Sequence, residues 1–334
     1  CGLAFSQEHM EFTLVLAGLV HDVHHPGLTP SFLLRANTGL AWNSPIRPPL
    51  KKSDAYLASK YNDQSPLENM HCAITFELLR DHRTAFLSQD DVALMKKPLV
   101  RAILGTDMAK HAETMTRLVA LVDNLNYKGA NGGIPWYWPA KPPVSADEEK
   151  RRAWEFNLQE EFVMELFLHA ADIGNPTLPF EQWVRWNGLV QDEFHAQGDL
   201  ERAEFGALIS PPAGFDRTAS LRAEQLFTKG FMQHLALPFF ELLDELTNVS
   251  PSGGSGAVSV AEGVNISCCV ENLRSNIRRW EENVPAEDAA RAPLLPEDQC
   301  PEEDDDDRPI LMTRQGSLTR RPSRSPVARE VSPL

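Results

Sequence analysis

The chain has 334 residues, of which 42% are hydrophobic, so it can bury a substantial core. Its formal net charge of −15 argues against a general binder of nucleic acid or anionic membranes, because phosphate groups would repel such a surface. The five cysteines form no CxxC pair, which indicates free thiols in a reducing compartment, and no apolar run approaches the roughly 20 residues that span a bilayer. We therefore expect a cytoplasmic protein without a membrane span.

The first predicted helix contains the apolar run 14–20 and ends in side chains that bind metals. His21 and Asp22 follow the run directly, and Pro26-Gly27 stops the helix. Adjacent residues point in different directions from a helix, so one ion can take the imidazole while the carboxylate bridges to a second ion. Such an oxygen-rich site suits Zn²⁺ paired with Mg²⁺ or Mn²⁺. The structural alternative is a hydrogen-bonded surface pair or a satisfied core histidine.

Helical periodicity without period-two alternation continues along the chain, which predicts an all-α, multi-helix fold. Ser65, Pro66 and Glu68 predict a capping box at the start of one of these helices. The further predicted helices lie within 29–40 and over 65–86, 88–103, 108–122, 147–173, 180–197, 219–246 and 266–282.

A second histidine and aspartate stand at the end of the 147–173 helix. His169 and Asp172 are three positions apart, so they share one face of that helix. This repeats the pattern of His21 and Asp22. We therefore expect two distant helix ends to meet around a dinuclear metal centre.

The composition changes beyond residue 284. An acidic run at 302–307 precedes a basic end rich in serine and proline, which predicts a disordered tail over 285–334 after a folded domain over 1–284. Ser317 and Ser323 follow arginines in the pattern that basophilic kinases favour. A kinase acting on these two serines is therefore a candidate partner.

Four spaced motifs carry a family resemblance. They are His21-Asp22-Val23-x-His25-Pro26-Gly27, Tyr61-Asn62-Asp63-x-Ser65-x-Leu67-Glu68-Asn69, Gly105-Thr106-Asp107-Met108-x-Lys110-His111 and His169-Ala170-Ala171-Asp172-Ile173-x-Asn175-Pro176. In this order they resemble the catalytic domain of the class I, mammalian-type 3',5'-cyclic nucleotide phosphodiesterases, over roughly residues 8 to 284. The resemblance implies metal-dependent hydrolysis of cyclic AMP, cyclic GMP or both to 5'-monophosphates, in signal transduction.

The resemblance also implies roles for single residues. His21, Asp22 and Asp172 would bind the tighter ion, with zinc expected, and Asp22 would bridge to a Mg²⁺ or Mn²⁺ ion. Asp22 would thereby take part in catalysis, with His25 and Glu68 orienting ligands and waters. Thr106, Asp107 and His169 would belong to the same outer set.

The family's nucleotide site implies a further group of residues. Asn175 would meet the edge of the purine, Val190 and Phe231 would sandwich the ring, and Phe194 would line the pocket. Counting forward from residues 218–220 assigns the second base contact to Gln225, whereas counting back from Pro238 assigns it to Thr228. We choose Gln225, and an ordinary core role for either phenylalanine stays open.

Some positions depart from the family pattern. A Tyr-His-Asn-x-x-His segment, which supplies the general acid and one more metal ligand, stands before the His-Asp pair in the family. We expect the chain to be truncated ahead of that pair, because His9 is too close to His21 to map onto either role. Loss of a general acid costs about 10² to 10⁴ in rate, so the chain alone is expected to be weak or inactive. Met70 stands where the family often has histidine.

Two other functions remain as alternatives. One is a different metal phosphohydrolase built on an HD-type helical site. The other is a non-catalytic interaction module, which the absent acid and the charged tail would favour. The sequence leaves the oligomeric state open.

Overall fold

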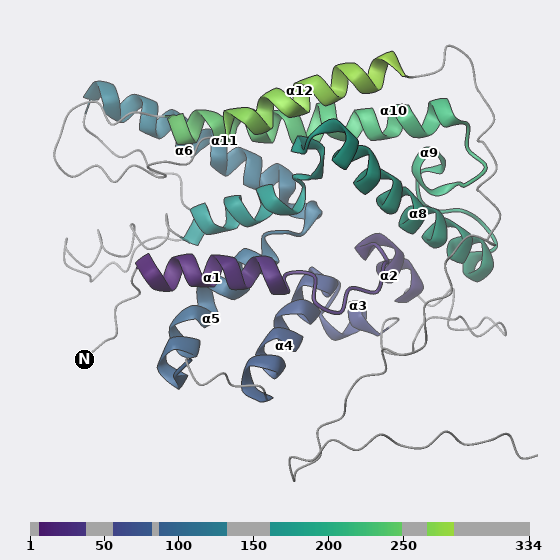
Figure 1. Ribbon diagram of the computed structural model, residues 1–334. Coiled ribbons are helices and arrows are strands. Elements are labelled where there is room, and N and C mark those ends of the chain that lie inside the picture. Colours follow the sequence, from purple (N-terminus) through teal and green to yellow (C-terminus); the bar gives the residue numbers. More distant parts are fainter. Residues whose placement is uncertain (1–6, 38–55, 82–86, 132–160, 249–265, 284–334) are drawn as a thin grey trace, which may run out of the picture. The chain divides into compact units, whose positions relative to one another are not determined.

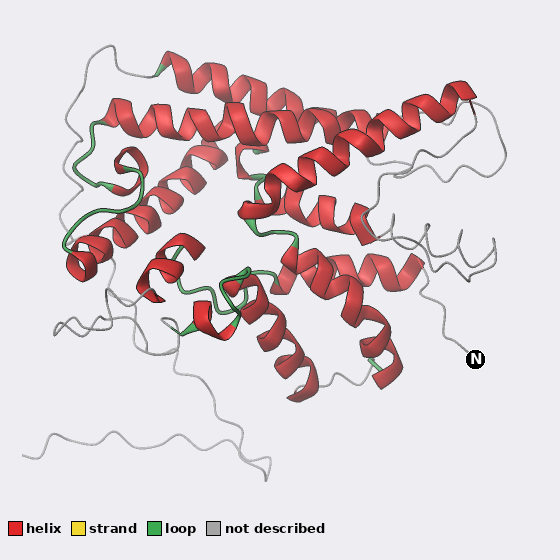
Figure 2. Cartoon of the chain, turned by 180° about the vertical axis from the view of Figure 1, so that it is seen from behind, coloured by secondary structure: helices red, strands yellow, loops and turns green. Residues whose placement is uncertain are grey.

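A computed structural model describes residues 7–37, 56–81, 87–131, 161–248 and 266–283 (Figure 1). Within these ranges every regular element is a helix, as the sequence predicts (Figure 2). Across the same residues, no helix is both long enough and apolar enough to cross a bilayer. The predicted tail over 285–334, with Ser317 and Ser323, lies outside the described residues.

The helices follow the predicted order along the chain. The first are α1 (Gln7–Val20), α2 (Pro30–Asn37), α3 (Leu57–Lys60), α4 (Pro66–Asp81), α5 (Gln89–Leu104), the 3-10 turn η1 (Met108–Lys110) and α6 (His111–Asn131). After a helix at 161–172 come the 3-10 turn η2 (Asn175–Thr177), α8 (Phe180–Phe205) and α9 (Pro212–Phe215). The last are α10 (Leu221–Phe231), the π-helical turn η3 (Met232–Ala236), α11 (Leu237–Asn248) and α12 (Ser267–Glu282). The predicted segment 147–160 lies outside the described residues.

Local signals account for several helix ends. Ser88 accepts a hydrogen bond from the backbone of Asp91, whose side chain accepts one from Ser88 N, so a capping box starts α5. Gly206, with φ of 71°, ends α8 eight residues later than predicted. The capping box predicted for α4 is wrong. Ser65 has φ of 41°, outside the extended region of an N-cap, and its hydroxyl donates instead to Asp107 Oδ2 at 2.6 Å.

Within the described ranges, the apolar side chains form three core clusters. The largest joins α6, the 161–172 helix, η3, α11 and α12 around Trp183 of α8. A second joins α2, α3 and α4. Figure 1 shows α11 and α12 running side by side, and they pack together in the largest cluster.

The third cluster sets the position of the polar helix ends. It joins Ala17 of α1, Cys72 of α4 and Leu168 of the 161–172 helix to α5. His21 lies one helical turn after Ala17, and Asp172 lies one turn after Leu168. Burial of the apolar turns therefore brings the ends of two helices together although they are far apart in the sequence.

Candidate metal centre

The end of α1 directs His21 towards two carboxylates. Its Nδ1 donates a hydrogen bond to Gly18 O at 2.9 Å, which leaves Nε2 for other partners. Nε2 lies 3.4 Å from Asp22 Oδ2 and 3.5 Å from Asp172 Oδ1. The two helix ends therefore meet as the sequence predicts.

These three residues form a group that fits a divalent cation. Their ligand atoms all lie within 4.8 Å of one another. A hydrogen bond to Asp172, with the attraction of both carboxylates, raises the pKa of His21 to about 9 against the opposing effect of burial. Without metal the imidazole thus carries a proton between two carboxylates. A cation would replace that proton, and one imidazole with two carboxylates is a donor set that Zn²⁺ accepts.

His71 on α4 completes a second group, which the sequence reasoning missed. Its Nδ1 donates to Val23 O at 2.8 Å, and its Nε2 lies 3.7 Å from Asp22 Oδ1. Burial lowers the pKa of His71, so the ring is neutral and Nε2 keeps its lone pair. Asp22, His25 and His71 also offer ligand atoms within 4.8 Å of one another. The sequence could have indicated His71 by its spacing, because it lies one turn after Glu68 and therefore on the same face of α4.

Glu68 supplies a carboxyl group that titrates near neutral pH. Its side chain is buried, and Oε2 has no hydrogen-bond partner. Burial raises the pKa of Glu68 to about 7, and the negative charges of Asp107 and Asp22 add to this effect. The backbone N–H of Glu68 and the charge of Lys110 oppose it. Glu68 can therefore hold or release a proton close to the two groups.

Ring contacts accompany two of the predicted histidines, His25 of the second group and His169. His25 accepts a hydrogen bond from Gly27 N at 3.1 Å, and its ring stacks on that of His71 with centroids 5.7 Å apart. His169 is fully buried and lies 2.9 Å from His111, nitrogen to nitrogen. Burial lowers the pKa of His169 to about 4, so this ring is neutral. Its predicted role in orienting metal ligands stays a prediction.

The five residues predicted to bind the base lie on three elements. Asn175 is in η2, Val190 and Phe194 are in α8, and Gln225 and Phe231 are in α10. Among the described residues no hydrogen bond or ring contact joins any two of them. Phe194 stacks on Phe215 of α9 with centroids 4.5 Å apart, and Phe231 packs against the largest core cluster. The hydrogen bonds and ring contacts of the described residues thus do not link this group, and its role in binding the base stays a prediction.

Two polar bridges connect α8 and α10, and the sequence reasoning missed both. The first is a buried pair, with His195 Nε2 at 3.2 Å from Glu224 Oε1, and it is an ion pair when the imidazole is protonated. The second is a hydrogen bond from Gln191 Nε2 to Thr228 Oγ1 at 3.3 Å. Thr228 is thus tied directly to α8, whereas the buried Oε1 of Gln225 has no partner. The choice between these two residues for the base contact stays a prediction.

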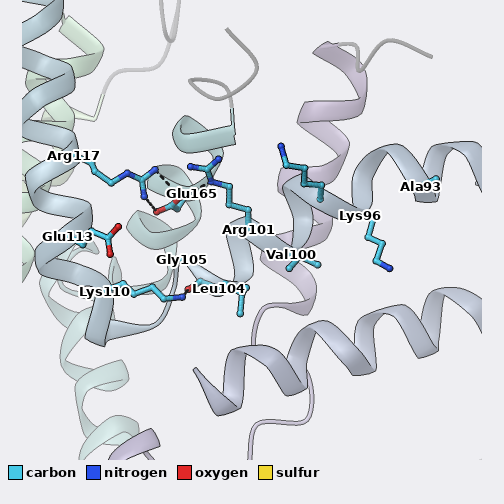
Figure 3. A pocket seen from close by; sticks show the side chains of 11 residues that line it. Ala93, Lys96, Val100, Arg101, Leu104, Gly105, Lys110, Glu113, Arg117 and Glu165 are labelled. Atoms are coloured by element: carbon cyan, nitrogen blue, oxygen red, sulfur yellow. Dashed lines mark hydrogen bonds and ion pairs between the residues drawn. The ribbon is translucent and has the colours of Figure 1, made fainter. Parts of the chain in front are cut away.

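A cavity of about 650 Å³ lies between α5, α6 and the 161–172 helix, lined by none of the predicted site residues. Its lining is basic, but Figure 3 shows Arg101 and Arg117 converging on Glu165. Arg117 lies 2.8 Å from Glu165, and Arg101 lies 2.8 Å from Glu161. A Cβ on Gly105 would come within 2.4 Å of Glu165 Cγ, so the glycine lets this carboxylate pack closely. We read the cavity as part of the scaffold.

Comparison with known proteins identifies the family. The family model described as 3'5'-cyclic nucleotide phosphodiesterase matches residues 48–252. A probable 3',5'-cyclic-AMP phosphodiesterase of Caenorhabditis elegans is 30% identical over 236 residues, which is 70% of this chain and 29% of that protein. Isoform F of a 3',5'-cyclic-AMP phosphodiesterase of Drosophila melanogaster is 31% identical over 238 residues, 70% of this chain and 30% of that protein. The chain spans less than a third of these curated relatives.

Solved structures agree with this match. LmjPDEB1 in complex with IBMX is similar with a TM-score of 0.55 and 26% identity, covering 83% of this chain and 66% of that one. The phosphodiesterase domain of the Salpingoeca rosetta rhodopsin phosphodiesterase is similar with a TM-score of 0.57 and 25% identity, covering 82% of this chain and 66% of that one. The chain belongs to the 3',5'-cyclic nucleotide phosphodiesterase family.

Proposed function

We propose that the chain hydrolyses 3',5'-cyclic nucleotides to 5'-monophosphates in a metal-dependent reaction. The observation that carries this proposal is the position of Asp22, which belongs to two groups of potential metal ligands at once. A carboxylate shared in this way can bridge two cations. Membership of the phosphodiesterase family supports the reaction class.

We propose different ions at the two positions. His21, Asp22 and Asp172 would hold the tighter ion, for which we propose Zn²⁺. Asp22 would bridge to a second ion, for which we propose Mg²⁺ or Mn²⁺. When bound, two such cations lower the pKa of a nearby water and offset the negative charge of a phosphate.

The surrounding residues orient these groups and handle protons. The carbonyls of Gly18 and Val23 each accept a hydrogen bond from an Nδ1, so the Nε2 atoms of His21 and His71 face Asp22. Glu68 gains or loses a proton at its carboxyl group near pH 7, which suits acid–base work under physiological conditions.

The purine would bind between η2, α8 and α10. The side-chain amide of Asn175 can both donate and accept, as the edge of adenine requires, and this slightly favours cyclic AMP. Both curated relatives named above are described as cyclic-AMP phosphodiesterases. We propose Val190, Phe194, Gln225 and Phe231 as the remaining contacts, with stacking on an aromatic ring contributing about 1 to 3 kcal/mol.

The test is turnover by the metal-depleted chain after Zn²⁺ and Mg²⁺ are added back. Cyclic AMP and cyclic GMP are incubated at high protein concentration, so that a slow rate is measurable, and the products are separated by chromatography. We expect 5'-monophosphate that disappears with chelator. Nucleoside monophosphates and polyphosphates in the same panel test the broader phosphohydrolase alternative.

A binding measurement tests the same proposal when the rate of turnover is too low to detect. Calorimetry of cyclic AMP binding is performed with and without the two metals, on the wild type and on Asp172→Asn. Metal-dependent binding that Asp172→Asn abolishes supports the proposed site. Absence of both product and metal-dependent binding would favour the interaction-module alternative.

A further inference from the structure

Two adjacent cysteines lie in the first turn of α12. Cys268 and Cys269 are the second and third residues of this helix, which begins at Ser267. Cys268 is exposed to solvent, whereas Cys269 is half-buried. Both are free thiols, and neither belongs to the candidate metal centre. The pair therefore combines an accessible sulfur with a sheltered one.

The sheltered thiol lies on a helix that packs against η2. Cys269 is partly buried against the largest core cluster, as is Leu178, which directly follows η2. Burial is the main cause that raises the pKa of Cys269, so this sulfur stays a thiol at neutral pH. An oxidant in solution therefore meets Cys268 first, and Cys269 is placed to react second.

Further along α12, two asparagine side chains donate hydrogen bonds to backbone carbonyls in and directly after η2. Asn272 Nδ2 donates to Thr177 O at 3.0 Å. Asn276 Nδ2 donates to Pro176 O and to Leu178 O, each at 2.8 Å. The turns of α12 that follow the cysteine pair are thus hydrogen-bonded to the turn after Asp172.

We propose that Cys268 and Cys269 form a vicinal dithiol that a hydroperoxide oxidises reversibly to a vicinal disulfide, and that this loosens η2. The Cys268 thiolate attacks the peroxide oxygen, gives a sulfenic acid and releases the alcohol or water formed by protonation of the other oxygen. The Cys269 thiol then attacks the Cys268 sulfur and displaces water as the S–S bond forms. One peroxide is reduced for two thiols oxidised.

Geometry makes this bond strained and therefore easy to reduce. Consecutive Cα atoms are about 3.8 Å apart, whereas bridged cysteines usually have Cα atoms about 4.4 to 6.8 Å apart. Closing the bond distorts the first turn of α12, whose hydrogen bonds run from Cys269 N and Val270 N to Ile266 O at 2.8 and 3.3 Å. Strained, exposed disulfides are the labile ones, so thiol reductants should reverse the reaction.

The first test is mass spectrometry of the whole chain after mild hydrogen peroxide treatment. Tryptic peptide 230–274 contains only these two cysteines. We expect this peptide to become about 2 Da lighter and resistant to alkylation, and dithiothreitol to restore both properties. Cys268→Ser should abolish the change, whereas Cys72→Ser, at a buried thiol, should not. Alkylation of both thiols after treatment, sulfinic acid without a disulfide, or disulfide-linked dimers would each overturn the proposal.

The second test measures the effect on η2 by hydrogen exchange. In the reduced chain Thr177 N bonds to Gly174 O at 2.9 Å, and Leu178 N bonds to Asn175 O at 3.2 Å. We expect oxidation to speed exchange of these amides about threefold to tenfold, as for the loss of one supporting hydrogen bond. Treated Cys268→Ser should exchange like the untreated wild type. Equal exchange in the reduced and oxidised wild type would overturn the link to η2, and neither test depends on turnover.

Discussion

The metal end and the base end of the candidate site are built differently. At the metal end His21, Asp22 and Asp172 converge within 4.8 Å from segments about 150 positions apart. At the base end the predicted residues lie on three elements, with no hydrogen bond or ring contact between them among the described residues, and α8 and α10 are joined by the His195–Glu224 pair and the Gln191–Thr228 bond. The metal end is thus organised by converging charged groups, in which a protonated His21 offsets the carboxylates when no cation is bound, whereas the base end is organised by polar bridges between two helices.

The largest expected effect tests the metal end. Asp172→Asn removes one of two carboxylates facing His21. We expect Zn²⁺ affinity to fall on the order of 10³-fold, because residues that merely orient ligands already contribute about 10- to 100-fold. Calorimetric titration with Zn²⁺ measures the change. Asp199→Asn, in an exposed pair with Arg217, is the matched control and should bind like the wild type. Equal affinity of the two variants would remove Asp172 from the centre.

The next largest effect tests the frame at the base end. Glu224→Gln removes the carboxylate that lies 3.2 Å from Nε2 of the buried His195. We expect the free energy of unfolding to fall by about 3 kcal/mol, measured by urea denaturation. Glu241→Gln, which breaks an exposed pair with Arg274, should cost less than about 1 kcal/mol. Similar losses in both variants would mean that the buried pair does not support the frame.

Titration of Glu68 tests the electrostatics at the metal end of the site. Its folded-state pKa is raised to about 7, so its contribution to stability is fully present below its ordinary pKa of 4.5 and is lost as the pH rises through about 7. Without metal, we expect Glu68→Gln to gain about 2 kcal/mol over the wild type between pH 5 and pH 8. Denaturation at both pH values measures this difference. A constant difference between the two proteins would refute the raised pKa.

The smallest expected effect distinguishes Gln225 from Thr228 as the residue that contacts the base. Gln225→Ala should raise the KM for cyclic AMP about tenfold with little change in kcat, because a contact to the base is made equally in the ground state and the transition state. Thr228→Val should change KM less than about twofold, since its side chain already bonds to Gln191. The opposite result would transfer the contact to Thr228. Steady-state kinetics on both variants is the measurement.

The sequence was informative wherever a short segment carries the signal. Helical periodicity predicted the longer helices seen among the described residues, but not the short helices α3 and α9, and α1 ends at Val20, ahead of the predicted Pro26-Gly27 stop. Helical spacing also put His169 and Asp172 on one face. These properties depend on backbone preferences and on side-chain periodicity within a few turns, which do not require knowledge of the partner.

The failures occurred where a side chain had a choice of partners. Ser65 matched a capping box, but in the folded chain its hydroxyl bonds to Asp107, which lies 42 positions later. His71 was overlooked next to Met70, because only the packing of α4 against the end of α1 brings its Nε2 towards Asp22. Counting along the sequence left Gln225 and Thr228 open for the base contact, and that choice stays a prediction, although the fold shows that Thr228 bonds to Gln191 of α8.

The sequence by itself determined the helical class, most helix boundaries and the residue types able to hold metal ions. Only the tertiary structure decided which of these residues meet. It did so through the core cluster of Ala17, Cys72 and Leu168, whose burial aligns three helices and brings their polar ends together. The physical reason is that apolar burial has no direction of its own, so the positions of the polar groups follow from packing that a local pattern does not encode.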